Sequence, residues 1–546
     1  MLGYFANARR GAMSIALGAC LLMSGVTGAQ EGGDLQPTIA EASLQSDQAE
    51  GPETSQPGAE KTLFVSEFVV QGNTLLTEAE IRSVVSGFEG RELTLGEMKE
   101  AANRLSDLYR DKGYLLVRAI VPKQDFGDGP VEIKVLEGKV GEVTVEGAKH
   151  FDSEWVKRHI DEATVDGVFQ ADRFQRKLLL LNDYDDLNVQ AVLKPGSETG
   201  TADIVVKVED GQPLHVGFDY NNYGIPETGE HRFGITLDAG NLATTGDNLR
   251  VRGVAQFPTD EFTYFAQVKY GAPINTNGTR LGLEYQRGAF AGGDGLAQVL
   301  DIRGDANVFS IYASHALSRK LDQSMDLAFT VSYKDVQNNI FNNAPLAREN
   351  YVTTRLDYSG DWRDVQGRSL FQASWTQGIG GDGGALVSNI RADDNFAKFN
   401  FGAMRIHNLA PGFYGVVRGT AQVATDSLYT LEQFSVGGMS TVRGFSQSEI
   451  LGDHGYTISG ELRWSPIKEN PEIFQVVTFI DHGGVRIIDR FPGELPTNNL
   501  TGAGFGFRSS PNENTSLTLD IGFPIAPSTN RFNNNVAIYG GIQTWF

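Results

Sequence analysis

From about residue 214 to the end of the chain, apolar and polar residues alternate with a period of two. In 325–334 the odd positions hold Met, Leu, Phe, Val and Tyr, whereas the even positions hold Asp, Ala, Thr, Ser and Lys. The same alternation recurs in 456–464 and 517–523. Strands of this kind suit a bilayer only when they close into a barrel, because closure leaves no backbone group unpaired in lipid. The region 212–546 is therefore predicted to be a transmembrane β-barrel.

The length of this region predicts the number of strands. At roughly 20 residues per strand and connection it accommodates ~16 antiparallel strands, and bacterial barrels prefer an even number. The chain has 64 Gly and 32 Phe, as tight turns and aromatic girdles require. A soluble β-sandwich is the alternative, but so many aromatic-rich faces in succession would overfill one core. Phe546 shares a face with Ile538 and Ile542, and we interpret it as the C-terminal barrel assembly signal.

The average composition does not reveal a membrane protein. Hydrophobic residues make up 40% of the chain and the mean hydropathy is -0.24, which is typical of a barrel because half of each strand faces a polar lumen. The formal net charge is -22. Nucleic acid is therefore not expected as a partner, since phosphate binding requires a basic face.

The first 29 residues have the features of a secretory signal peptide. Arg9 and Arg10 supply the charged start, and the apolar run 15–23 is too short to span a bilayer as a helix. Cleavage near Ala29 would remove Cys20, the only cysteine, so the mature chain would need no redox partner. Export combined with the barrel pattern predicts the outer membrane of a Gram-negative bacterium.

Residues 30–61 differ in composition from the rest of the chain. They are rich in Glu, Gln, Ser, Pro and Gly, and such a segment buries too little apolar surface to order itself. We predict a polar linker, with one short helix at 38–49.

An internal repeat lies between the linker and the barrel. Residues 69–75 (VVQGNTL) resemble 143–149 (VTVEGAK), and 131–138 resemble 204–211. All four pieces read as strands, so two units of about equal length each begin and end with a strand.

Two helical segments are predicted between the strands of each repeat unit. Apolar residues at helical spacing mark them, and Gly113 makes a suitable C-terminal stop for the longest. The four predicted helices are 78–86, 95–112, 153–161 and 171–181. The repeat therefore predicts two small α/β domains, at 62–138 and 139–211.

No motif for catalysis stands out. The chain contains no Gly-x-x-x-x-Gly-Lys-Ser/Thr loop, which argues against nucleotide-driven transport, and its eight His residues lack metal-ligand spacing. The run 378–383 formally matches a dinucleotide-binding loop, but it lies between barrel strands with no helix after it, so a surface loop is the better interpretation. We expect no enzymatic activity, no cofactor and no metal.

The glycine-rich run 437–445 interrupts the barrel pattern. It cannot form a regular strand, and 446–455 are also loop-like, so we predict a connection of about 20 residues, long for a barrel turn. If this loop folds inward, Arg443 needs a partner, because an unpaired buried charge is costly. Asp481, two residues after Phe479 on the same strand face, could pair with it bidentately. From spacing alone, an exposed loop and an unrelated lumen acid are an equal alternative.

A resemblance to a known family favours the inward loop. The run GGMSTVRGFSQSEILGDHGY, the strand TISGELRW and the segment FIDHGGV resemble the two-partner secretion transporters, the exporters of hemolysin and filamentous hemagglutinin, over 62–546. The resemblance implies a 16-stranded barrel preceded by two POTRA domains. It further implies that the sixth extracellular loop enters the lumen and that Arg443 contacts Asp481. The implied motif residues are Val442, Arg443, Gly444 and Phe445 on the loop, with Phe479 and Asp481 on the wall.

The resemblance also implies a function. The POTRA domains would hold an unfolded exoprotein in the periplasm by strand addition and shallow apolar grooves, and the barrel would export it without ATP. The exoprotein is expected to be a β-helical adhesin or cytolysin. We expect a monomer that sits in outer-membrane lipid after insertion by the barrel assembly machinery. The residues expected to line a groove on the first POTRA domain are Arg104, Leu108, Tyr109, Val117 and Val121.

Two other functions are compatible with a barrel. The first is an insertase that assembles other barrels, although that branch usually carries more than two POTRA domains. The second is a passive porin, for which two periplasmic domains would have no use.

Overall fold

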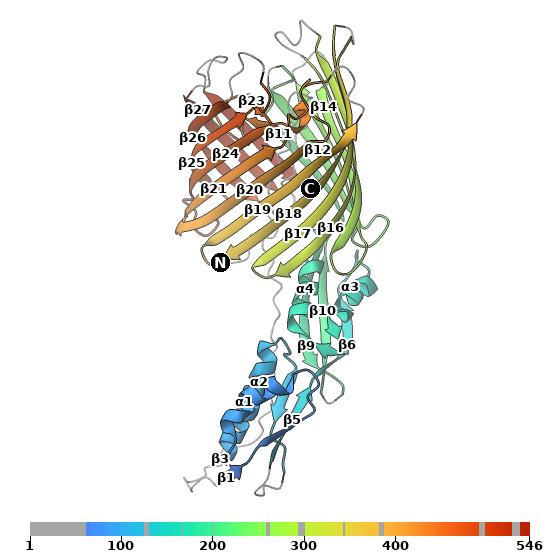
Figure 1. The fold of residues 1–546 in the computed structure, drawn as a ribbon, viewed down its shortest axis with the longest axis vertical. Coiled ribbons are helices and arrows are strands. Elements are labelled where there is room, and N and C mark those ends of the chain that lie inside the picture. The colour runs from blue at the N-terminus through green and yellow to red at the C-terminus, as the bar shows by residue number, and fades with distance from the viewer. Residues whose placement is uncertain are drawn as a thin grey trace. The chain divides into compact units, whose positions relative to one another are not determined.

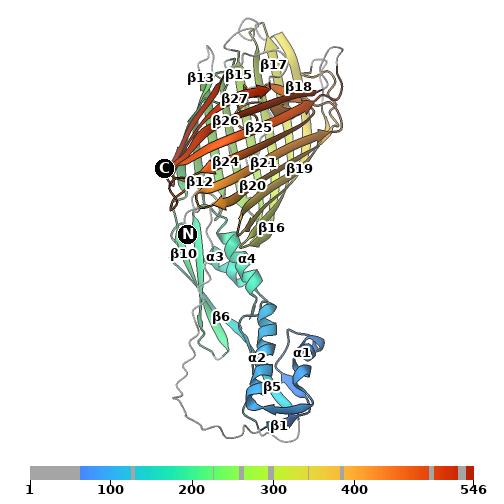
Figure 2. The same ribbon diagram turned by 90° about the vertical axis from the view of Figure 1, so that its left-hand side faces the viewer.

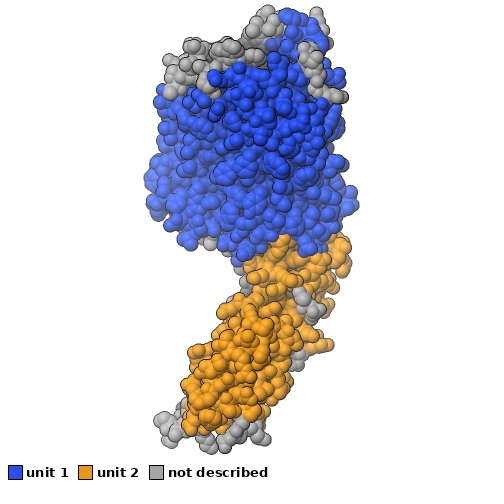
Figure 3. All heavy atoms as spheres, viewed as in Figure 1, with its two compact units in different colours: residues 1–36, 212–546 blue, residues 37–211 orange. Residues whose placement is uncertain are grey.

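The computed structural model describes residues 62–124, 130–165, 167–198, 200–225, 227–257, 263–292, 301–341, 344–381, 387–490, 497–526 and 536–546. The predicted signal peptide and linker, 1–61, lie outside the described residues. The described chain falls into two compact units, 62–211 and 212–546 (Figure 3). The first unit contains two α/β domains and the second is a barrel (Figure 1).

The first α/β domain packs two helices on a small sheet. Its elements are β1 (Thr62–Val65), β2 (Phe68–Gln71), α1 (Glu78–Val85), η2 (Ser86–Phe88), β3 (Arg91–Thr94), α2 (Leu95–Asp111), β4 (Val117–Ile120) and β5 (Val131–Glu137). The main sheet has the order β2-β5-β4, with β2 parallel to β5. Both helices begin with a capping box, in which Thr77 pairs with Glu80 and Thr94 with Glu97, so local sequence sets both starts.

The second α/β domain repeats this plan with a larger sheet. Its elements are β6 (Lys139–Glu146), α3 (Ser153–Asp161), β7 (Thr164–Val165), β8 (Val168–Phe169), α4 (Ala171–Leu181), β9 (Leu187–Pro195) and β10 (Thr201–Asp210). The sheet order is β7-β8-β6-β10-β9, and β6 is parallel to β10. No helix in the described part of the chain is both long and apolar enough to cross a membrane.

Two glycines at equivalent places show that the sequence repeat is a structural repeat. Gly72 follows β2 and Gly147 follows β6, with φ of 82° and 94°. A Cβ atom would lie 2.5 Å from the carbonyl oxygen of Val135 at the first site and 2.3 Å from that of Val208 at the second. Only glycine combines this left-handed backbone with so close an approach.

Sixteen strands of the described residues form a closed antiparallel barrel (Figures 1 and 2). They are β11 (Leu214–Asn221), β12 (His231–Gly240), β13 (Asn248–Phe257), β14 (Thr263–Pro273), β15 (Thr279–Ala291), β16 (Arg303–Lys320), β17 (Gln323–Ile340), β18 (Ala344–Asp364), β19 (Gly367–Gly381), β20 (Ala397–Ala410), β21 (Phe413–Ala424), β24 (His454–Trp464), β25 (Gln475–Arg486), β26 (Thr497–Asn512), β27 (Thr515–Ala526) and β28 (Ala537–Trp545). The predicted mainly β fold, with two α/β domains before a 16-stranded barrel, is confirmed.

The two faces of the barrel wall carry different side chains. The apolar residues of the predicted alternation are exposed on the outer face, as lipid contact requires. They include Phe329, Val331, Tyr333, Tyr456, Ile458, Leu462, Leu517, Leu519 and Phe523. Polar residues between them, such as Thr457, Ser459 and Asp520, are buried on the lumen side.

The barrel closes through a short seam between its first and last strands. The ladder joins Gly217–Asn221 of β11 to Gly541–Trp545 of β28, and every other pair of neighbouring barrel strands has a longer ladder. Phe546 extends the seam, because its backbone N–H and C=O both bond to Val216. The Phe546 side chain is 72% exposed, and its ring meets Phe218 edge-on at 6.1 Å.

Candidate functional site in the barrel lumen

The connection between β21 and β24, residues 425–453, is much longer than a barrel turn and is called the lumen loop below. It contains η3 (Thr430–Glu432) and a hairpin of β22 (Phe434–Val436) and β23 (Ile450–Gly452). Beyond β22 lies its tip, 437–445.

The tip is a tight turn that glycine makes possible. Gly437, Gly438 and Gly444 have φ of 119°, 95° and 103°, in the region that favours glycine. The Thr441 hydroxyl accepts from the backbone N–H of Gly437 at 2.8 Å and donates to its carbonyl at 2.9 Å. This closed turn brings Arg443 to the barrel wall.

The Arg443 side chain forms a bidentate pair with Asp481 of β25. Its Nε and Nη2 donate to the two Asp481 carboxylate oxygens at 2.7 and 2.9 Å, and the Arg443 backbone N–H donates to Asp481 at 3.1 Å. Arg443 is 1% exposed and Asp481 is 0% exposed. Charge-assisted bonds between side chains as buried as these are strong and directional.

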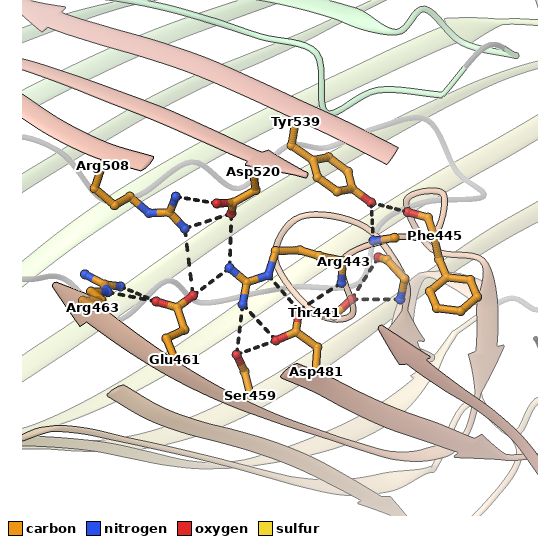
Figure 4. Close-up of polar contacts among 12 residues, drawn as sticks. Thr441, Arg443, Phe445, Ser459, Glu461, Arg463, Asp481, Arg508, Asp520 and Tyr539 are labelled. Carbon is orange, nitrogen blue, oxygen red and sulfur yellow. Dashed lines mark hydrogen bonds and ion pairs between the residues drawn. The ribbon is translucent and has the colours of Figure 1, made fainter. Parts of the chain in front are cut away.

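Two further carboxylates contact the same guanidinium. Arg443 Nη1 donates to Glu461 of β24 at 2.7 Å and to Asp520 of β27 at 3.1 Å. Nη2 also lies 3.3 Å from the Ser459 hydroxyl, which donates to Asp481 at 2.6 Å. One cation of the loop thereby joins three strands of the wall (Figure 4).

Other arginines of the wall balance the extra negative charge. Arg508 donates to both Asp520 oxygens at 2.6 and 2.8 Å, and Arg463 donates to Glu461 at 2.9 Å. Each of the three carboxylates therefore has a cation or a hydroxyl as a partner besides Arg443.

Aromatic contacts complete the seat of the tip. The Arg443 guanidinium carbon lies 3.4 Å from the centroid of the Phe479 ring, a cation–π geometry. The Tyr539 hydroxyl of β28 accepts from Gly444 N–H at 3.1 Å and donates to the Phe445 carbonyl at 2.6 Å (Figure 4). Val442 is fully buried in a small apolar cluster to which Phe445 also belongs.

Glycines on the wall let the tip backbone approach closely. A Cβ atom on Gly502 would lie 1.9 Å from the Arg443 carbonyl oxygen, and one on Gly522 would lie 2.5 Å from the Gly444 nitrogen. Any side chain at either position would push the tip off the wall.

The five residues predicted to line a groove on the first α/β domain occupy different environments. Tyr109 and Val117 lie in the core, which corrects that part of the prediction, because α2 and β4 direct them into the layer between helix and sheet. Leu108 and Val121 are partly buried against this core. Arg104 is exposed, pairs with Glu100 at 2.7 Å and lies over the Phe88 ring.

Several residues of the site were missed by sequence reasoning. Glu461 and Asp520 were recognised as polar positions of alternating strands, but nothing local distinguishes them from other lumen residues. An acidic residue on a lumen face is the signal that could have found them. Gly502, Arg508 and Tyr539 gave no such signal, since their roles depend on the register of the closed barrel.

Family models match most of the chain. The model described as "Haemolysin secretion/activation protein ShlB/FhaC/HecB" matches residues 200–509, which is 310 of 546 residues, and the ShlB-type POTRA domain model matches 63–138. The chain belongs to the haemolysin secretion/activation family.

Curated members of this family are similar over three quarters of the chain. The heme/hemopexin transporter protein HuxB of Haemophilus influenzae is 23% identical over 433 residues, which cover 76% of this chain and 74% of HuxB. The outer membrane transporter CdiB of Escherichia coli O6:K15:H31 is 24% identical over 430 residues, which cover 76% and 71%. The solved structure of CdiB from Escherichia coli has the same fold, with a TM-score of 0.75 at 21% identity over 91% of this chain and 93% of CdiB.

Family membership fixes the class and the location of the protein. It is an outer-membrane β-barrel transporter of the two-partner secretion class, and its POTRA domains lie in the periplasm. In the described part of the chain, no group of His, Cys, Asp and Glu side chains is arranged to hold a metal ion.

Proposed function

We propose that this transporter captures an unfolded exoprotein through its POTRA domains and exports it through the barrel without ATP, with the tip of the lumen loop as a displaceable lid. The observation that carries the proposal is the docking of Arg443 on Asp481, Glu461 and Asp520. A loop held by a few polar bonds on a glycine-lined wall can dock in one defined place and leave without unfolding the barrel.

The wall favours a reversible lid over a fixed plug. When the tip leaves, Arg508 still neutralises Asp520 and Arg463 still neutralises Glu461. Undocking therefore leaves mainly Asp481 without its cation. A moderate free energy of binding between the exoprotein and the barrel is enough to offset this loss. The absence of a nucleotide-binding loop from the sequence agrees with transport driven by folding of the exoprotein outside the cell.

Capture would use the surface of the first POTRA domain. Strand β4 forms an edge of the sheet β2-β5-β4, and an edge offers backbone groups to an added strand. Leu108 and Val121 leave part of their apolar surface uncovered beside it, and the exposed Arg104 is paired with Glu100. This combination suits an extended chain with apolar residues, as expected of a β-helical exoprotein.

Deletion of 62–210 tests the proposal. The barrel should still insert, as judged by heat-modifiable migration in gels, whereas the exoprotein should accumulate in the periplasm. Continued secretion would refute capture by the POTRA domains. A census of other outer-membrane proteins is the control for specificity, because a fall in unrelated barrels would instead identify an insertase.

A further inference from the structure

The lumen loop is buried at a second place, well before its tip. Residues 428–432, here called the stem, include the η3 turn. Leu428, Tyr429 and Glu432 are each at most 3% exposed. A buried carboxylate in a loop requires a specific partner, because its desolvation is otherwise uncompensated.

Glu432 has two cationic partners on the barrel wall. Its carboxylate pairs with Lys398 of β20 at 2.9 Å and with Lys334 of β17. The Tyr351 hydroxyl of β18 donates to the same carboxylate at 3.0 Å. Lys398 also donates to the Glu432 carbonyl oxygen at 2.8 Å, so side chain and backbone of Glu432 are both held.

Apolar contacts hold the rest of the stem. The Tyr429 ring stacks on Tyr351 with centroids 4.6 Å apart. Leu431 packs against an apolar cluster on the inner face of five successive strands, β13 to β17. The cluster consists of Val254, Phe265, Phe290, Ala306 and Val336.

The stem and the tip are attached to different strands of the wall. The stem contacts β17, β18 and β20, which precede β21 in the barrel order. The tip contacts the other part of the wall, namely β24, β25, β27 and β28. The stem and tip are therefore attached to different sides of the barrel.

The stem occupies the outer part of the lumen. The POTRA domains precede β11 and lie in the periplasm, so β11 runs outward and successive strands alternate in direction. The strand β21 is the eleventh of the barrel order and also runs outward, and the stem follows its outer end. Lys398 is the second residue of the inward-running β20, which places the ionic contact near the same end.

We propose that Glu432, Lys334 and Lys398 form a second ionic anchor of the lumen loop, which positions the stem as an outer barrier independent of the Arg443 tip. This inference rests on the proposed function, in which the loop must be displaced during export. Release of the tip alone would leave the stem attached in the outer lumen. The exoprotein therefore has to break two contacts, on different parts of the wall, before the whole lumen loop is free to move.

Single-channel recording of the purified full-length protein tests the anchor. Glu432→Gln removes the negative charge at nearly constant volume, and we expect at least about a tenfold rise in the fraction of time spent open, because two partly buried cations lose their counter-charge. Arg443→Ala should act on a separate conductance step, and the double variant should show both changes.

The control variant is Glu284→Gln. Glu284 is another lumen carboxylate, paired with Lys269 on β14, so this change alters lumen charge to the same extent without touching the stem contacts. Equal open fractions for Glu432→Gln and Glu284→Gln would overturn the proposal. If Glu432→Gln fails to insert, the variant K334Q/K398Q breaks the anchor with the loop sequence intact, and wild-type gating in that variant would overturn it equally.

The recordings contain no exoprotein and no secretion step. If the anchor proposal is wrong, Glu432→Gln will leave the open fraction unchanged. If instead the proposed export function is wrong, secretion of the exoprotein will persist after deletion of 62–210. The charge exchange K398E/E432K supplies a rescue, since it restores an ammonium–carboxylate pair. We expect it to return the open fraction toward that of the wild type, and an open fraction equal to that of Glu432→Gln would count against the ionic role.

Discussion

Replacement of Arg443 by Ala should release the tip of the lumen loop while the barrel stays folded. Of the three carboxylates that Arg443 contacts, Asp520 keeps two bonds from Arg508 and Glu461 keeps Arg463. Asp481 loses its bidentate partner and keeps the Ser459 hydroxyl and the backbone N–H of residue 443. Removal of one partner from a buried ion pair costs about 3–5 kcal/mol, which shifts the docking equilibrium by roughly 150- to 4,000-fold.

Thiol labelling measures this equilibrium directly. Val442→Cys places a thiol in the buried part of the tip, and the only native cysteine, Cys20, lies in the predicted signal peptide. In the Val442→Cys background, the rate of labelling with a charged maleimide reports the fraction of molecules in which the tip is undocked. Arg443→Ala should raise this labelling rate by the same factor as it shifts the docking equilibrium. Secretion should fall in parallel, with a modest loss of barrel abundance.

A second substitution separates loss of the pair from general damage. Asp481→Asn removes the charge that Arg443→Ala leaves without a cation, so the double variant should lose about 1–3 kcal/mol less than the sum of the single variants. Arg463→Ala is the matched control, because this arginine contacts Glu461 and not the tip. Labelling of Arg443→Ala at the rate of Arg463→Ala, or strict additivity with Asp481→Asn, would refute the reasoning.

Two other predictions concern the wall and the periplasmic region. Gly502→Ala should also undock the tip, because its Cβ would meet the Arg443 carbonyl oxygen at 1.9 Å. Thiol labelling checks it, with Gly253→Ala as control since a Cβ there meets nothing closer than 3.8 Å. Burial lowers the pKa of His159 in the second POTRA domain below its ordinary value. Below about pH 6.5 the His159 imidazole is therefore protonated in the unfolded chain but stays neutral in the native domain. Protonation stabilises the unfolded state, so the free energy of unfolding of this domain should fall as the pH drops below about 6.5. Hydrogen exchange of 153–181 in the full-length protein, corrected for the intrinsic rate, should show this pH dependence in the wild type and lose most of it in His159→Gln.

Features specified by local sequence could be predicted well. The helices expected at 153–161 and 171–181 coincide with α3 and α4, and that expected at 78–86 differs from α1 by one residue. Capping residues and apolar spacing lie within a single segment, so no tertiary information was needed. The alternation of barrel strands is local for the same reason.

The length of the lumen loop could not be predicted in the same way. The sequence indicated a connection of about 20 residues, whereas β21 already ends at Ala424 and β24 begins at His454. Leu428, Tyr429 and Leu431 resemble an outward continuation of β21, because apolar residues in a strand and in a loop that packs across a lumen look alike. Only the closed barrel shows that these side chains meet strands far away in the sequence.

The bond between the tip and Tyr539 has a consequence for how the protein is made. Tyr539 belongs to β28, which follows every other barrel strand in the sequence, and Arg443 also requires residues of β24, β25 and β27. The contacts of the tip are therefore incomplete until β28 has been placed in the barrel. A docked tip thus distinguishes a closed barrel from a partly assembled one. Protection of the tip from thiol labelling would report when β28 has been placed in the barrel.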